Sequence, residues 1–430
     1  MNLLKLAWKN IVHNPLSLFL NLILLALGIG LINFILLLDN QLKDKFDKNL
    51  AEIDLVIGAK GSPLQMILCS MYHIDAPTGN ISIKEAKPFL RENHPLLKRS
   101  VPLSMGDSYK GYRIIGTDHT ILEVYAAEIS EGKKWNNVLE VTAGYDVAKE
   151  LGLKLGSKFK SSHGFNDDED LTHDHGTFKV VGILKSTGSV IDQLLLCSAE
   201  TVWEVHDHEA GGNEENDDHD GHDHDGHDHA EHSHKNDMSR SHLLTHEDQE
   251  ITSILLQYRN RTNFQALSLG RNINENTDLQ AASPAYELNR LYDMMGTGTK
   301  ALQLLAILIA VVSAISIFIS LLNSLKQRKY ELSLLRVLGG KPVSLLTLIL
   351  LEGFIMALLG FIIGYLGSQL ALSGLAESLS EKYNYKFVSW TTHGKEWILF
   401  LATIFLGLCA ALLPAFMAYK TNIHKNLSEG

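Results

Sequence analysis

Four long apolar runs divide the chain into hydrophobic and polar parts. They cover residues 16–38, 301–322, 343–372 and 397–419, and only the third contains a charged residue, Glu352. A helix rises ~1.5 Å per residue, so about 20 apolar residues cross the ~30 Å hydrocarbon core of a membrane. A secretory signal peptide would have a shorter apolar region, of about 7–15 residues. The pattern therefore predicts four transmembrane helices.

The region between the first and second runs has the mixed pattern of a folded domain. Short apolar segments broken by glycine predict strands at 53–61, 110–117 and 251–260. Helical periodicity appears at 82–93 and 263–276. The expected fold class is an α-helical membrane protein: four transmembrane helices with a large mixed α+β extracytoplasmic domain, residues 39–300, between helices 1 and 2.

Half-polar helical patterns flank this domain on both sides. Apolar residues recur at i, i+4, i+8 and i+11 after the first run, at Leu42, Phe46, Leu50 and Ile53. A similar set precedes the second run, at Leu288, Leu291 and Met295. We interpret the pair as stalk helices that carry the domain. Two surface helices of the domain itself would fit the periodicity almost as well.

The segment at 323–342, between the second and third runs, is amphipathic and basic. Its charged residues are five bases and a single acid: Lys326, Arg328, Lys329, Arg336, Lys341 and Glu331. Leu332, Leu335 and Leu338 recur beside them at helical spacing, and Gly339 and Gly340 predict the end of a helix. Basic residues next to a transmembrane helix mark its cytoplasmic side. We therefore expect both termini to be cytoplasmic and residues 39–300 to lie outside.

The remaining segments are short. Residues 1–15 form an amphipathic cytoplasmic segment with Lys5 and Lys9 on its polar side. Residues 373–396 are expected to form an outside loop, and residues 420–430 a cytoplasmic tail.

The acidity of the chain is local. The whole chain has a net charge of −11, whereas residues 201–250 contain 16 Asp and Glu against 2 Lys and Arg, a net of −14. The rest therefore sums to +3, and the composition gives no indication of a nucleic-acid partner. Cys69, Cys197 and Cys409 do not form a disulfide framework. Cys69 and Cys197 would share the outside domain, where a bridge is permitted, but two unpaired buried thiols fit better.

The run R-x-x-E-x-x-x-x-R-x-x-G-G (Arg328, Glu331, Arg336, Gly339 and Gly340) resembles the coupling segment of the MacB/FtsX-type ABC transporter permeases. The opening AWKNIVHNPLS, the segment AGYDVAKELGLKLGSKF and the ending LLPAFMAYK are also similar to that family. The resemblance implies an inner-membrane permease with a cytoplasmic ABC ATPase as a separate subunit. It further implies a second permease chain, in a homodimer or heterodimer, and suggests a periplasmic partner. The five motif residues would then couple the permease to the ATPase.

A few residues inside the apolar runs are unusual for a membrane helix. Glu352 is an ionisable group at membrane depth and is a functional candidate by default. Gly360 and Gly364 form a GxxxG pattern, which lets helix backbones approach closely. Pro414 belongs to the terminal pattern shared with the family. Helix packing and transport chemistry explain Glu352 about equally well.

A histidine-rich tract is the one feature that the family does not require. It lies in an insertion at 204–248 that has too few apolar residues to fold by itself, and is expected to be disordered. Its candidate metal ligands alternate with acidic residues: His219, His222, His224, His227, His229, His232 and His234. Imidazole and carboxylate ligands suit Zn and other divalent metals. A solvated loop of drifting composition is the alternative. No integral cofactor is expected.

No enzyme motif emerges. The GxxxxGK[ST] phosphate loop is missing, since the nearest stretch at 296–300 has the wrong spacing. The HExxH pair of a metalloprotease is also missing, because His246-Glu247 has no second histidine three residues on. The sequence thus predicts a permease that transmits ATPase motion to its periplasmic domain, with a possible link to metal handling. The alternative is a membrane-anchored periplasmic metal sensor or binding protein without transport activity.

Overall fold

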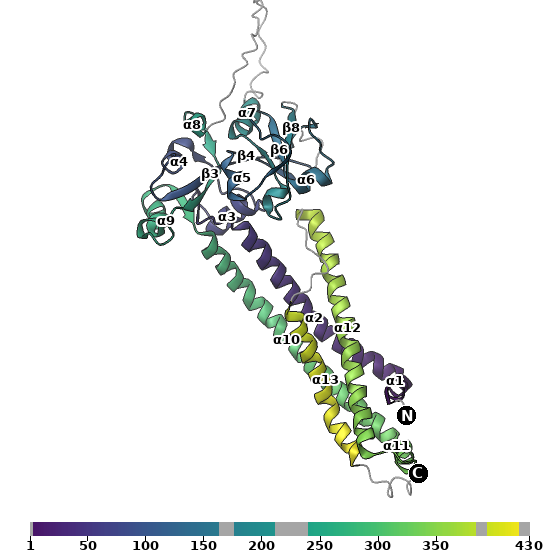
Figure 1. Cartoon of the computed structure of the whole chain (residues 1–430). Helices are drawn as coiled ribbons and strands as arrows, with labels where there is room; N and C mark the ends of the chain where they lie inside the picture. Colours follow the sequence, from purple (N-terminus) through teal and green to yellow (C-terminus); the bar gives the residue numbers. More distant parts are fainter. Residues whose placement is uncertain (1–2, 163–175, 211–239, 384–393, 421–430) are drawn as a thin grey trace, which may run out of the picture. The chain divides into compact units, whose positions relative to one another are not determined.

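The computed structural model describes residues 3–162, 176–210, 240–383 and 394–420 (Figure 1). The chain divides into two compact units. Met1–Lys43 and Asp293–Gly430 form the first, which we call the membrane unit. Asp44–Tyr292 forms the second, which we call the sheet unit.

Among its described residues the membrane unit contains four helices long and apolar enough to cross a membrane, which confirms the fold class predicted from the apolar runs. The helices that build it are α1 (Leu3–His13), α2 (Pro15–Asn49), α10 (Pro284–Gln327), α11 (Lys329–Val337), α12 (Pro342–Tyr383) and α13 (Lys395–Tyr419). Leucine, isoleucine, phenylalanine and valine side chains are exposed along α2, α10, α12 and α13, as contact with lipid requires.

Two helices continue far beyond their apolar runs. α10 is 44 residues long and α2 is 35, so both extend into the sheet unit. α12 reaches Tyr383, so the expected loop at 373–396 begins as helix, in a stretch with no proline and no glycine after Gly374. Among the residues expected in that loop, 384–393 lie outside the described part of the chain.

The sheet unit is built on one mixed sheet in the strand order β12-β1-β11-β3-β4-β9-β6-β8-β5, with β7 beside β8. These strands are β1 (Leu55–Ala59), β3 (Leu97–Tyr109), β4 (Tyr112–Thr117), β5 (Ile129–Gly132), β6 (Glu140–Ala143), β7 (Lys158–Phe159), β8 (Phe178–Leu184), β9 (Leu195–Cys197), β11 (Ser253–Tyr258) and β12 (Leu279–Ala282). Neighbours are antiparallel except for β4 with β9 and β6 with β8. β2 (Ile81–Ser82) and β10 (Glu250–Ile251) form a separate pair.

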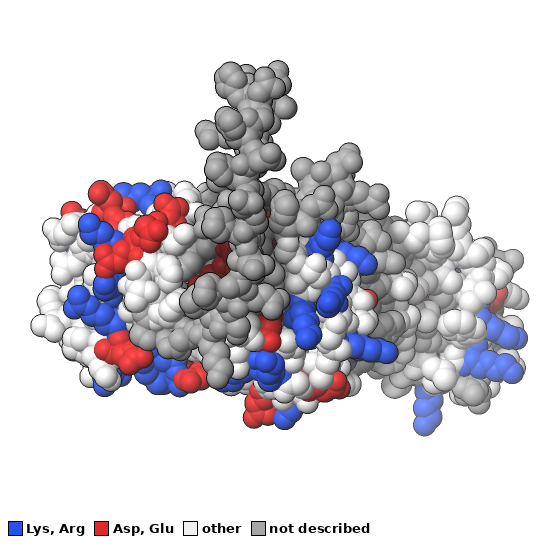
Figure 2. Space-filling model, turned by 90° about the horizontal axis from the view of Figure 1, so that it is seen from above, with Lys and Arg blue, Asp and Glu red and all other residues white. Residues whose placement is uncertain are grey.

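Helices cover this sheet and complete two apolar cores. They are α3 (Pro63–Tyr72), α4 (Ile83–Leu90), α5 (Thr120–Val124), α6 (Tyr145–Glu150), α7 (Ala199–Ala210), α8 (Arg240–Leu243) and α9 (Phe264–Asn276), with a 3-10 turn at Val190–Gln193. One core gathers β1, β11, α4 and α9, and the other gathers β4, β6, β8 and α6. Figure 2 shows Lys and Arg side chains interspersed with Asp and Glu side chains over the visible face of the sheet unit.

The predicted strands and helices of this unit are confirmed at β1, β4, β11, α4 and α9. Ser82 caps α4 through a 3.3 Å bond from the Glu85 amide, and Glu85 accepts a bond from the Ser82 hydroxyl in return. β3 was missed because Pro102 and Gly106 interrupt its pattern. Pro102 is tolerated in this central strand, where its carbonyl oxygen accepts a bond from the Thr117 hydroxyl at 2.8 Å.

The predicted helix through Ile53 was too long. α2 ends at Asn49, and Ala51 and Glu52 have left-handed backbone angles of φ 43° and φ 59°. Phe46, near this end, packs edge-on against Tyr72 at 4.9 Å and Tyr292 at 5.9 Å between ring centroids. The end of α2 is therefore fixed by contacts within the sheet unit.

Cys69, Cys197 and Cys409 are all free, which confirms the unpaired thiols expected from the sequence. Cys69 and Cys197 are buried, and Cys409 is exposed on α13.

The insertion expected at 204–248 covers fewer residues in the structure. α7 runs to Ala210, and the chain is described again from Arg240. Arg240 explains the difference, because its guanidinium pairs with the Asp118 carboxylate at 2.6 Å and also bonds Thr120. That ion pair holds α8 against α5. Residues 211–239, and with them the histidine tract, lie outside the described residues.

Candidate functional site

α11 is a short helix held between two membrane helices. α10 ends at Gln327, and Arg328 has the non-helical angles φ −108° and ψ 17° before α11 begins. At the other end Gly339 has φ +97°, which favours glycine, and the Gly340 amide bonds the Leu335 carbonyl at 2.9 Å. A Cβ on Gly340 would lie 2.7 Å from that carbonyl oxygen. The two glycines thus end the helix, as the sequence predicted.

One face of α11 is packed against the membrane unit, and the other is exposed. Leu332 and Ser333 are buried, and Leu335 packs on the core of the membrane unit. The opposite face is exposed although it is largely apolar, with exposed fractions between 44% at Leu334 and 77% at Leu338. We call it the docking face, and its residues are Tyr330, Glu331, Leu334, Val337 and Leu338.

The helical spacing predicted that Leu338 lies on the same face as Leu332 and Leu335, but in the structure it does not. The helix ends at Val337, one residue earlier, so Leu338 sits in the cap and turns outward. Arg336 is half-buried, whereas Glu331 is exposed.

Arg328 points into the membrane unit and is not part of the docking face. Its Nη2 donates to the main-chain oxygen of Asn10 at 3.1 Å. Its guanidinium is also close enough to Glu352 for an electrostatic attraction. No basic residue lies within the four apolar runs, so the sequence alone offers Glu352 no cation at membrane depth. The structure corrects this, since the α10–α11 break brings Arg328 back toward α12.

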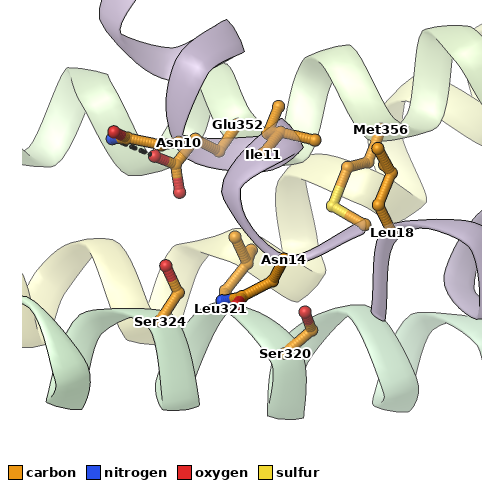
Figure 3. A pocket seen from close by; sticks show the side chains of 9 residues that line it. All are labelled: Asn10, Ile11, Asn14, Leu18, Ser320, Leu321, Ser324, Glu352 and Met356. Atoms are coloured by element: carbon orange, nitrogen blue, oxygen red, sulfur yellow. Dashed lines mark hydrogen bonds between the residues drawn. The ribbon is translucent and has the colours of Figure 1, made fainter. Parts of the chain in front are cut away.

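Glu352 is 2% exposed and bonds to α1. Its Oε1 accepts a bond from Asn10 Nδ2 at 2.7 Å, and Figure 3 shows the two side chains meeting beside a small cavity. The cavity has a volume of about 30 Å³, enough for one or two water molecules. Its remaining polar lining comes from Asn14, Ser320 and Ser324.

Sequence reasoning missed the partners of the polar residues inside α2. Asn21 accepts a bond from Ser316 at 2.5 Å, and Asn33 donates to Ser368 at 2.7 Å. These bonds link α2 to α10 and to α12. A buried amide in an apolar helix costs free energy unless it is bonded, so each asparagine was itself a signal that a polar partner exists.

Glycines bring the membrane helices into backbone contact. A Cβ built on Gly364 would lie 2.7 Å from the Ala26 oxygen and 3.0 Å from the Gly30 nitrogen. Gly360 differs, because an added Cβ there would meet the Leu25 side chain and not backbone. The GxxxG pattern therefore packs α12 against α2 within one chain. A second contact was missed: Gly353 and Gly407 bring α12 against α13.

The remaining predicted site residues are Pro414 and the seven histidines of the tract. Pro414 is buried within α13. The seven histidines of the tract lie outside the described residues. Among the residues that are described, no group of three or more His, Cys, Asp or Glu side chains is arranged to hold a metal ion.

Two family models match the chain. The FtsX-like permease C-terminal model matches residues 304–427, and the MacB-like periplasmic core domain model matches residues 18–216. No curated protein matches the sequence. Among solved structures, the periplasmic region of MacB from Actinobacillus actinomycetemcomitans matches with 11% identity and a TM-score of 0.32, covering 57% of this chain and 97% of its own. That TM-score is too low to support an argument.

The two family models lie in the order that the fold requires. The MacB-like model covers α2 and the larger part of the sheet unit, and the FtsX-like model covers the last three membrane helices with α11. The sequence motif at 328–340 falls inside the second of them. The chain belongs to the MacB/FtsX-type family of ABC transporter permeases.

Proposed function

We propose that this permease transmits the motion of a separate cytoplasmic ATPase to its own extracytoplasmic domain. The observation that carries the proposal is the docking face of α11. It exposes Tyr330, Leu334, Val337 and Leu338 on a helix of nine residues that is too short to cross a membrane. Exposed apolar surface of this kind marks an interaction site.

Charge supports a cytoplasmic location for this face. Lys326, Lys329 and Lys341 are exposed around α11, and basic residues next to membrane helices favour the cytoplasmic side. An ATPase acts in that compartment. With this orientation both termini are cytoplasmic and the sheet unit lies in the periplasm of a bacterial inner membrane. Family resemblance adds a second permease chain and a periplasmic partner to the proposed assembly.

The docking face can be tested directly. Leu334→Glu with Leu338→Glu places two charges where an apolar contact is proposed, without touching the buried Leu332. We expect at least about a tenfold loss of copurifying ATPase, because burying an unpaired charge costs several kcal/mol. Leu267→Glu is the matched control, since Leu267, on α9 of the sheet unit, is 63% exposed, between Leu334 and Leu338. Equal ATPase recovery from both variants would contradict the docking role.

We also propose that the histidine-rich tract gathers divalent metal for this transporter. Its imidazoles are the usual ligands for Zn²⁺, with an ordinary pKa of about 6.5, so they should coordinate near pH 7 and release metal near pH 5. The test is a deletion of residues 211–239 that keeps α7 and Arg240, joined by a short Gly/Ser linker. Calorimetry with Zn²⁺ should show several weak sites in the full chain and their loss in the deletion variant. Equal Zn²⁺ binding by the full chain and the deletion variant would exclude the tract as the metal site.

The alternative is a membrane-anchored metal sensor or binding protein without transport. That function needs no ATPase and no exposed apolar face on α11. Failure to recover any ATPase with the wild-type chain, together with intact Zn²⁺ binding, would favour it.

A further inference from the structure

The break between α10 and α11 would be a flexible hinge if nothing held it. Arg328 is the single residue between the two helices, and its backbone is not helical. A movement of α11 could be absorbed by rotation at this residue and would then not reach the membrane helices. Arg328 is, however, held from another element, because its side chain reaches Asn10 of α1.

Asn10 joins this break to α12. Its main-chain oxygen accepts from Arg328 at 3.1 Å, and its side-chain amide donates to Glu352 at 2.7 Å. One residue of α1 thus bonds both the N-cap of α11 and the first third of the following helix, α12. In the sequence, Asn10 and Glu352 are 342 residues apart.

The residues around Asn10 and Glu352 are buried, which fixes the position of these two side chains. Ala7 and Ile11, on the same side of α1 as Asn10, are buried in the core of the membrane unit together with Leu332 of α11. Glu352 is buried and has Arg328 as its nearby cation. Removing the Glu352 carboxyl leaves the Asn10 side-chain amide without its acceptor.

We propose that Asn10, Arg328 and Glu352 form a joint that passes displacement of α11 to α12 and α1. The joint rests on the proposed function, because an ATPase bound at the docking face supplies the displacement. The three residues are positioning residues: they fix the angle between α11 and the membrane helices. Without the joint, α11 still binds its partner but moves independently.

The first measurement needs no ATPase. Amide hydrogen exchange is recorded on the full-length chain in lipid nanodiscs for wild type, Asn10→Asp, Glu352→Gln and the double variant. Asn10→Asp sets two carboxylates against each other, and we expect about tenfold faster exchange in α1 and α11. Glu352→Gln keeps an amide oxygen that can accept the Asn10 bond but replaces the carboxyl group near Arg328, so its effect should be of the same kind and smaller.

The double variant provides the rescue. The side-chain amide introduced at position 352 can donate to the carboxylate introduced at position 10, so the bond is restored with donor and acceptor exchanged, and a carboxylate again lies near Arg328. Exchange should return to the wild-type rate. Asn323→Asp is the matched control, because Asn323 is exposed on α10 and does not line the cavity beside Glu352.

The second measurement uses the complex with the copurified ATPase. The single variants should retain the ATPase but lose about fivefold of its permease-dependent activity, and the double variant should recover it. Loss of ATPase binding in the Leu334→Glu, Leu338→Glu variant tests the docking face separately. Wild-type exchange in the single variants, or no recovery in the double variant, would overturn the joint even if the docking face holds.

Discussion

Single glycines decide how closely the membrane helices pack. Gly364 faces the Ala26 oxygen and the Gly30 nitrogen, whereas Gly367, three residues further on α12, has no atom within 4 Å of an added Cβ. The same substitution at the two positions therefore separates helix propensity from packing.

We expect Gly364→Ala to destabilise the membrane unit by about 1–3 kcal/mol, because the new methyl group meets backbone that cannot move aside. Gly367→Ala should be neutral or slightly stabilising, since alanine favours helix. Thermal unfolding in detergent measures both. Equal melting temperatures for the two variants would show that the close approach of α12 and α2 is unimportant.

His73 makes the sheet unit sensitive to acid. It caps α3 with a left-handed backbone, and burial, together with the nearby Arg113, lowers its pKa to about 3. The unfolded chain, with an ordinary pKa of about 6.5, therefore binds one more proton between these values. The stability from neutral His73 is complete above pH 6.5 and decreases as the pH falls toward 3.

Lowering the pH from 7 to 4.5 should cost about 2–3 kcal/mol through His73 alone. His73→Asn removes the titrating group and retains a residue that tolerates the left-handed conformation. The melting temperature of the variant should fall less between these pH values than that of the wild type. Parallel pH profiles for the two proteins would show that His73 does not contribute.

Among the elements, α2 has an unusual double role. It is apolar through the membrane unit, and its last turns pack within the sheet unit through Phe46. Phe46 contacts Tyr72 and Tyr292, and the Tyr72 hydroxyl bonds its main-chain oxygen at 3.2 Å. The C-terminal turns of α2 are therefore packed within the sheet unit.

Phe46→Ala should destabilise the sheet unit by about 3–5 kcal/mol, the usual range for loss of a buried aromatic ring. Limited proteolysis should then cut near residues 49–54, where the chain leaves α2. Met294→Ala is the control, because Met294 is exposed on α10. Resistance equal to wild type in the Phe46 variant would contradict a fixed stalk.

The topology of the whole molecule can be read by cysteine labelling in intact cells. Lys134 is exposed on the sheet unit and Lys326 is exposed beside α11. In a Cys409→Ser background, Lys134→Cys should react with a membrane-impermeant reagent, and Lys326→Cys should react only after lysis. The other native thiols should stay silent: both are buried, and burial raises the pKa of Cys69 to about 11 and that of Cys197 further. Labelling of Lys326→Cys before lysis would show that the membrane orientation is the opposite of the one proposed.

Local patterns in the sequence were enough to predict much of the molecule. The apolar runs predicted four membrane helices because a bilayer imposes one length and one composition on every helix that crosses it. Strands such as β4 and β11 and the end of α11 at Gly339 were predicted for a similar reason, since each depends on neighbouring residues. β3 was missed, because only its neighbours β11 and β4 stabilise a strand interrupted by Pro102.

Only the tertiary structure decided which side chains meet. In the sequence, Arg328 belongs to the motif expected to couple the permease to the ATPase, and no apolar run offers Glu352 a cation. Folding brings both to Asn10, at the opposite end of the sequence. No local pattern encodes such a contact, because it depends on how α1, α10 and α12 pack. The sequence by itself determined the helices and the family motif, whereas three-dimensional packing determined which motif residues are exposed, as Glu331 is, and which hold the helices together, as Arg328 does.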